Sequence, residues 1–150
     1  MKAISKAQAQ SFDPHQLRNA LGSFATGVTI ITANDVDPDT YVGVTANSFN
    51  SVSLDPPLVL WNLAKKARSL PAYQSSEYFA VNVLASDQTE LANRFATQQP
   101  GKFNDVDFEL GVGGIPLLAG CAAHFQCKSS LSYEGGDHVI FVGEVLQFDD

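Results

Sequence analysis

Short runs of apolar, β-branched and aromatic residues dominate the sequence, and turn-forming segments such as NDVDPDT and SLDPP separate them. A parallel sheet would need a helix after nearly every strand, whereas the helical segments here are few and short. The pattern therefore predicts a mainly β, mostly antiparallel barrel with a few short peripheral helices. The predicted strands cover residues 28–33, 41–49, 57–63 and 78–84, and a hairpin is expected from residues 120–133 and 138–148 around the turn EGGD.

A first helix is predicted to begin after Asp13, an N-cap residue that precedes a proline at the first helical position. Leu17, Leu21 and Phe24 repeat at helical spacing, so we expect this apolar stripe to pack on the sheet. Two shorter helices are expected, one after Ser69 and the other from residue 86 or 87 onward. Residues 1–11 are expected to be a flexible N-terminal segment, followed by a single domain at residues 12–150.

The composition limits the class of protein and its partners. A chain of 150 residues with 45% hydrophobic content can build one core without disulfides or metals. The net charge of −7 repels phosphate backbones and anionic lipids, so nucleic acid and membrane surfaces are poor partners. No apolar stretch approaches the roughly 20 residues of a membrane helix, and the first residues lack the apolar core of a signal peptide. The expected location is the cytoplasm. Because strands such as LVLW are apolar on both faces, we also expect a partner subunit over the outside of the barrel.

Several kinds of chemistry can be set aside. Cys121 and Cys127 fall on one predicted strand roughly 20 Å apart, beyond the reach of a disulfide, so we expect buried thiols. His124 and Cys127 point to opposite strand faces, and no further residues complete a tetrahedral metal site. The serine-hydrolase motif GxSxG is absent. The segment GVGGIP at 111–116 does not open a long helix, so it is predicted to be a turn.

Three polar features stand out, and each has an ordinary structural explanation beside a functional one. The run TANSFNSVS at residues 45–53 is either a hydrated turn or a surface that faces a polar ligand. The segment AKKARSLP at 64–71 sets cations beside a helix start, which suits a phosphate, although a solvated loop would look similar. His138 follows the turn glycines at the start of a strand, where a polar residue is also unremarkable.

Taken together, these motifs resemble the flavin reductase family, which supplies reduced flavin to two-component monooxygenases. The resemblance runs from Phe12 to Phe148 through LGSFATGVTIITA, VGVTANSFNSVSLDPPLVLW, FAVNVLASDQTELANRFA, GIPLLAGCAAHFQC and EGGDHVIFVGEV. The sequence is most similar to the reductase components of aromatic hydroxylases such as the 4-hydroxyphenylacetate system. The resemblance implies an antiparallel Greek-key split barrel of the FMN-binding type, a homodimer, FMN or FAD as flavin, NADH or NADPH as reductant, and an oxygenase partner.

The resemblance also implies the site. It assigns His138 a place beside the nicotinamide, as a positioning or catalytic residue. In such a site, hydride passes from nicotinamide C4 to flavin N5 when the two rings stack. The residues expected to bind the flavin are Thr45, Ala46, Asn47 and Ser48 at its ring and ribityl chain, Ser51, Val52 and Ser53 along the ribityl and phosphate, Lys65, Arg68 and Ser69 at the phosphate or adenylate, and Lys102 and Phe103 at its far end.

Two alternatives to a flavin reductase remain open. One is a split-barrel flavoenzyme that retains its flavin and acts on its own organic substrate. The other is a non-catalytic domain that binds or stores flavin, although the GDH turn with His138 argues against it.

Overall fold

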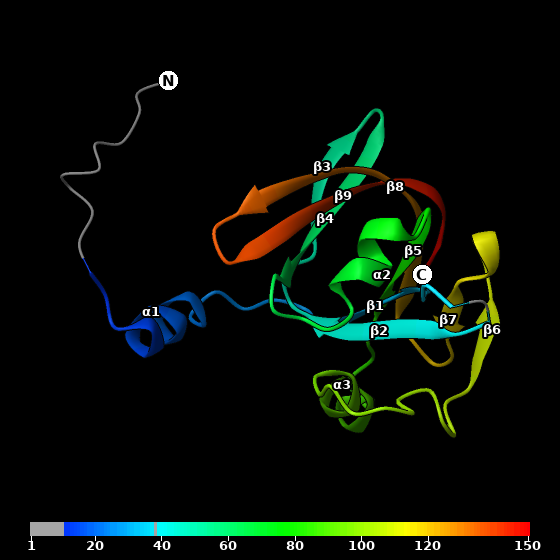
Figure 1. The fold of residues 1–150 in the computed structure, drawn as a ribbon, viewed down its shortest axis with the longest axis horizontal. Helices are drawn as coiled ribbons and strands as arrows, with labels where there is room; N and C mark the ends of the chain where they lie inside the picture. Colours follow the sequence, from blue (N-terminus) through cyan, green and yellow to red (C-terminus); the bar gives the residue numbers. More distant parts are fainter. Residues whose placement is uncertain (1–10, 38) are drawn as a thin grey trace.

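The computed structural model describes residues 11–37 and 39–150, so nearly all of the predicted flexible segment at 1–11 lies outside the described residues. One seven-stranded antiparallel sheet forms most of the domain, in the order β2-β1-β5-β8-β9-β4-β3 (Figure 1). The main-sheet strands are β1 (Thr29–Asn34), β2 (Tyr41–Ala46), β3 (Asn50–Leu54), β4 (Pro57–Ala64), β5 (Tyr78–Val83), β8 (Ala123–Gly135) and β9 (His138–Asp149). The remaining elements are α1 (Pro14–Leu21), α2 (Leu70–Ser75), α3 (Thr89–Phe95), a 3-10 turn at Val112–Gly114, and a two-stranded sheet of β6 (Phe108–Leu110) and β7 (Pro116–Leu118).

This architecture confirms the predicted mainly β, antiparallel fold with short helices. The long hairpin of β8 and β9 carries two register shifts, and both strands bend strongly around the core (Figure 1). The edge strands β2 and β3 do not pair with each other, so the barrel is split rather than closed. The segment at 111–116 forms a turn as expected, with Gly113 and Gly114 at positive φ.

The core fills the inner face of the sheet. Alternate residues of β4 are buried, and the ring of Trp61 stacks on Phe141 at 5.0 Å between centroids and meets Tyr73 edge-on at 4.9 Å. Tyr73 belongs to α2, and its hydroxyl donates to the carbonyl of Ile31 over 2.6 Å. Burial raises the pKa of this phenol well above its usual value, so it stays a neutral donor. The contact fixes α2 across one end of the sheet.

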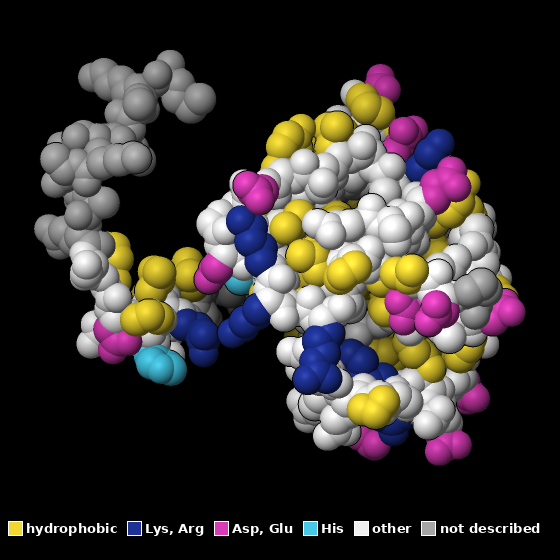
Figure 2. Space-filling view, viewed as in Figure 1, with side chains coloured by type: hydrophobic (Ala, Val, Ile, Leu, Met, Phe, Trp, Pro, Cys, Tyr) yellow, Lys and Arg dark blue, Asp and Glu magenta, His cyan; other side chains and the backbone are white. Residues whose placement is uncertain are grey.

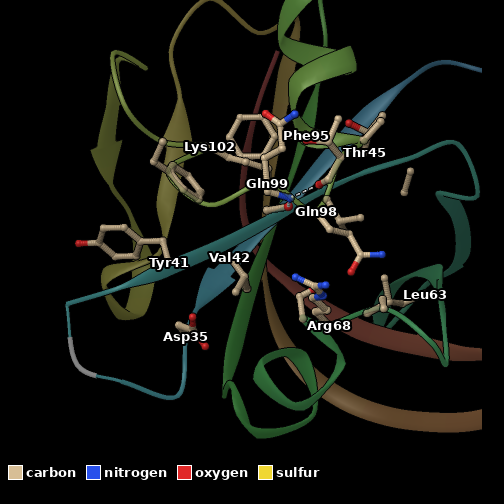
Figure 3. A pocket seen from close by; sticks show the side chains of 18 of the residues that line it. Asp35, Tyr41, Val42, Thr45, Leu63, Arg68, Phe95, Gln98, Gln99 and Lys102 are labelled. Atoms are coloured by element: carbon tan, nitrogen blue, oxygen red, sulfur yellow. Dashed lines mark hydrogen bonds between the residues drawn. The ribbon is translucent and has the colours of Figure 1, made fainter.

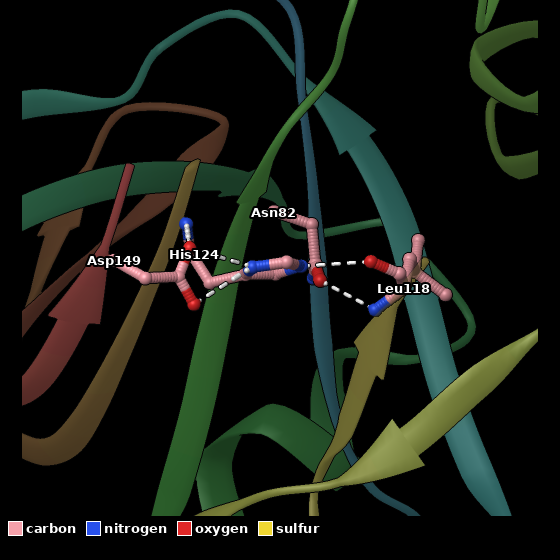
Figure 4. A network of polar contacts seen from close by, with 4 residues as sticks. All are labelled: Asn82, Leu118, His124 and Asp149. Carbon is pink, nitrogen blue, oxygen red and sulfur yellow. Dashed lines mark hydrogen bonds and ion pairs between the residues drawn. The ribbon is translucent and has the colours of Figure 1, made fainter. Parts of the chain in front are cut away.

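A polar network attaches β7 to the main sheet (Figure 4). The buried side-chain oxygen of Asn82 accepts from the backbone N–H of Leu118 over 2.9 Å, and Nε2 of His124 donates to the carbonyl of Leu118 over 2.7 Å. Nδ1 of the same imidazole lies 3.0 Å from a carboxylate oxygen of Asp149. His124 therefore has a structural role here. Within residues 11–37 and 39–150, no group of three His, Cys, Asp or Glu side chains could hold a metal ion.

Helix α1 departs from the sequence prediction. It begins after Asp13 as expected, with the carboxylate accepting from the N–H of His15. However, Leu17, Leu21 and Phe24 do not pack on the sheet, since they are 48%, 66% and 76% exposed. The helix lies apart from the barrel at the end of an extended segment, and hydrophobic side chains are exposed along it (Figures 1 and 2). The expected packing within the chain is wrong because no residue of α1 is buried.

The cysteines are free thiols, as predicted, although only one is fully buried. Cys127 is completely inaccessible on β8, and burial raises the pKa of its thiol to about 12. Cys121 precedes β8 instead of lying on it and is partly exposed. None of the described helices is long and apolar enough to cross a membrane.

Candidate functional site

A cavity of about 1190 Å³ opens along β2, one edge of the main sheet (Figure 3). Its lining comes from β2 and the turn after it, the end of β4, the segment before α2, the end of α3 with the loop that follows, the β1–β2 connection, and the start of β9. Small-molecule pockets usually measure roughly 300–1,000 Å³. The cavity therefore has room for a ligand larger than a single ring system.

The floor of the cavity is β2, and hydrogen bonds from two threonine hydroxyls join this strand to α3 and to β1. Thr45 donates through Oγ1 to the carbonyl of Ala92 in α3 over 2.6 Å. Thr29 on β1 donates in the same way to the carbonyl of Ala46 over 2.7 Å. Because its hydroxyl hydrogen is committed to α3, Thr45 can offer a ligand only the lone pairs of its oxygen.

The turn after β2 connects the floor to β4. The hydroxyl oxygen of Ser48 accepts from the backbone N–H of Asn62 over 2.8 Å, while Asn47 is exposed beside it. Asn62 also lines the cavity, and its buried side-chain oxygen has no hydrogen-bond partner among the residues that the structure describes. A ring N–H, such as that of the flavin pyrimidine, is the kind of donor that this oxygen lacks. The lining therefore fits the polar end of a flavin ring.

The basic segment before α2 divides between the cavity and the surface. Arg68 and Ser69 line the cavity, and Ser69 is the N-cap residue of α2 without a side-chain capping bond, so its hydroxyl has no partner among the residues that the structure describes. Lys65 lies outside the lining. Its ammonium is 3.4 Å from the carboxylate of Glu134 on the β8–β9 hairpin. Both of these side chains are substantially exposed, so this ion pair contributes little to stability.

The rim opposite Arg68 is the loop that follows α3. The ammonium of Lys102 donates to the carbonyls of Gly43 and Thr97 over 2.7 and 2.9 Å. Burial lowers the pKa of this lysine from its usual value. Phe103 turns toward a cluster of aromatic rings, with its centroid 5.0 Å from that of Phe95 and 5.9 Å from that of Tyr41.

His138 stands at the mouth of the cavity, where β9 begins. Its Nδ1 lies 2.8 Å from the carboxylate of Asp137, and this hydrogen bond lowers the pKa of Asp137. The pair orients the imidazole, since Nδ1 carries the proton that the carboxylate accepts. In the described part of the chain Nε2 has no partner, which leaves it free for a ligand.

The structure brings most of the expected site residues together. Four do not reach the cavity, since Ser51, Val52 and Ser53 lie on β3 and Lys65 pairs with Glu134. The assignment of these four to the ligand stays a prediction. The cavity is lined by the other nine: Thr45, Ala46, Asn47, Ser48, Arg68, Ser69, Lys102, Phe103 and His138.

Sequence reasoning missed several lining residues. Asn62 had a visible signal, because it is the single amide within the apolar run PLVLWNL. Gln98 and Gln99 precede a Pro-Gly turn after α3, and they form part of the rim. Asp35 and Asp39 line the cavity from the β1–β2 connection. In the sequence they belong to the segment NDVDPDT, which indicated only a turn.

The bond between Ser48 and Asn62 gives a testable consequence. Replacing Ser48 with alanine leaves the N–H of Asn62 without its acceptor, so we expect the free energy of unfolding to fall by about 1–2 kcal/mol. Chemical denaturation measures the change. Ser132→Ala, an exposed serine of β8 with no hydrogen bond from its hydroxyl to a described residue, is the matched control. Equal stability of the two variants would show that this bond does not hold the turn.

The sequence matches the flavin reductase like domain over residues 21–149. It is 48% identical to the FMN reductase (NADH) SmoA of Agrobacterium fabrum, over 87% of this chain and 73% of that protein. It is 42% identical to HsaB of Rhodococcus jostii, the reductase subunit of a flavin-dependent monooxygenase, over 95% of this chain and 72% of that protein.

A solved structure of a flavin oxidoreductase has the same fold. The NADH:FAD oxidoreductase SgcE6 of Streptomyces globisporus superposes with a TM-score of 0.84 at 44% identity, over 94% of this chain and 86% of that one. Some relatives are much longer: the chain is 46% identical to a probable flavin reductase of Rhizobium meliloti and spans only 45% of its length. The matched region covers most of the sequence and all seven strands of the main sheet, and the chain belongs to the flavin reductase-like family.

Proposed function

We propose that the protein is an NAD(P)H:flavin oxidoreductase that reduces FMN or FAD and supplies diffusible reduced flavin to a partner monooxygenase. The observation that carries this proposal is the cavity, which is large enough for a flavin with a nicotinamide beside it and is lined by Thr45, Ser48, Arg68 and His138. Relatives described as FMN reductase, FAD reductase and monooxygenase reductase subunit support the same activity and the oxygenase partner.

The residues would bind and orient, because the chemistry belongs to the cofactors. The bound flavin would accept hydride from the nicotinamide and supply the redox chemistry. Asn62 and the 45–48 segment would hold the polar ring end, and Arg68 with Ser69 would meet the phosphate side. His138, oriented by Asp137, would donate or accept a hydrogen bond through Nε2 and position the nicotinamide.

The deciding experiment mixes purified protein with NADH and catalytic amounts of free FMN or FAD in air and follows NADH loss by absorbance, with NADPH in parallel. Rapid loss that saturates with added flavin establishes a flavin reductase and identifies both cofactors. Tight flavin binding with no NADH oxidation would instead favour a storage domain. Flavin that remains bound through purification without turnover of added flavin would point to an enzyme with its own substrate.

His138→Ala tests the nicotinamide assignment. Loss of the imidazole should raise the KM for NADH by about tenfold, the size expected for one polar contact, while the flavin dissociation constant changes little. Steady-state kinetics and fluorescence titration measure the two values. His15→Ala on α1 is the control, because His15 does not line the cavity. An unchanged KM would remove His138 from the nicotinamide site.

We further propose a homodimer in the cytoplasm. The exposed stripe of α1 supports the dimer, because an eight-residue helix is not stable in water without packing partners. Further exposed apolar residues on the sheet, including Leu131 and Tyr133 of β8, offer a second copy a surface to cover. The two free thiols fit a reducing compartment.

The role of α1 in the dimer can be tested by replacing the apolar side chains of its exposed stripe. Leu17→Ser, Leu21→Ser and Phe24→Ser together should convert the dimer into a monomer in light scattering after size exclusion, because they remove the apolar face. Val36→Ser is the control, since Val36 is 66% exposed in the turn after β1. A triple variant that stays dimeric would show that α1 is not part of the interface.

A further inference from the structure

We propose that Lys102 is a positioning residue whose ammonium clamps the loop of residues 97–104 onto β2 and so fixes the rim of the cavity. This differs from the role that the resemblance assigns, in which Lys102 binds the flavin directly. The flavin readout below rests on the proposed function, whereas the loop readout does not.

The clamp joins two segments that are far apart in the sequence. Nζ of Lys102 donates to the carbonyl of Gly43 on β2 over 2.7 Å and to the carbonyl of Thr97 at the start of the loop over 2.9 Å. Since β2 is an edge strand, its outward carbonyls have no partner strand, and the ammonium satisfies one of them. It is the one hydrogen bond that joins this loop to β2 within residues 11–37 and 39–150.

The surroundings of the ammonium hold it in this position. Nζ lies 5.5 Å from the centroid of the fully buried Phe95 ring, a cation–π contact. Gly43 allows this arrangement, because a Cβ there would come within 2.6 Å of that ring. Partial burial removes water from the charge, so the two carbonyls and the ring replace the lost hydration.

The loop has other anchors, but they act at its ends. Arg94 on α3 donates to the carbonyl of Asn104 over 2.9 Å, and the hydroxyl of Thr97 donates to the carbonyl of Arg94 over 2.8 Å. Between these ends, Gln98, Gln99 and the Pro-Gly turn line the cavity (Figure 3). Without the clamp, this stretch would remain attached to α3 and to the Phe103 cluster while losing its hydrogen bond to the floor of the cavity.

Lys102→Met tests the clamp, because methionine keeps much of the packing and removes the ammonium. Hydrogen exchange without flavin should show backbone amides of the loop, such as Asn104, which donates to Gly101, exchanging at least about tenfold faster. The flavin dissociation constant should rise by about tenfold, a larger change than any change in kcat. Lys128→Met makes the same chemical change at an exposed site on β8, outside the cavity lining, and should alter neither value.

The possible outcomes are distinct. Unchanged loop exchange in Lys102→Met overturns the proposal, and weaker flavin binding with that result would make Lys102 a direct ligand. Faster loop exchange with weaker flavin binding supports it. If wild type binds no flavin, the proposed function fails while the exchange experiment still decides the clamp. Should Lys102→Met not fold, Lys102→Gln gives the same test, since its amide is too short to reach both carbonyls.

Discussion

The packing of Trp61 against Phe141 and Tyr73 is the contact on which the site depends. It fills the inner face of the sheet where β4 and β9 pair, and it holds Tyr73, hence α2, in place. The hydroxyl of Tyr73 then fixes α2 against β1. Arg68 and Ser69 immediately precede α2, so the packing that positions α2 also positions these two residues at the cavity. Disruption of this aromatic packing would therefore displace Arg68 and Ser69, although none of the three aromatic residues lines the cavity.

An open sheet edge is the second constraint. A closed barrel would pair β2 along its full length, whereas the split leaves its outer side available to side chains and ligands. Thr45 uses its hydroxyl to bind α3 there, and Lys102 uses its ammonium to bind the following loop. The edge that would otherwise promote strand pairing between molecules thus becomes the floor of a cavity.

Sequence reasoning recovered the strands with strong β-branched and aromatic runs, since their pattern depends on burial within the chain. It missed β3, whose residues are mostly exposed at the sheet edge and therefore show no alternation of apolar and polar residues. The assignment of Lys65 to the phosphate or adenylate of a flavin stays a prediction, and the local segment could not reveal that Glu134 lies opposite this lysine across the fold. The prediction that the α1 stripe packs on the sheet is wrong, because periodicity shows that a helix has an apolar face but does not show which surface covers that face.

The charge of the site bears on how firmly a flavin would be held. The chain carries a net charge of −7, and Asp35 and Asp39 add carboxylates at the cavity itself. Of the cations there, Lys102 is occupied by two carbonyls, whereas Arg68 forms no ion pair with the described residues. An anionic cofactor would thus meet one uncommitted guanidinium in an acidic surrounding, which limits the electrostatic part of its affinity. Modest affinity suits a reductase that must pass its reduced flavin to another protein, because a tightly held product would leave slowly.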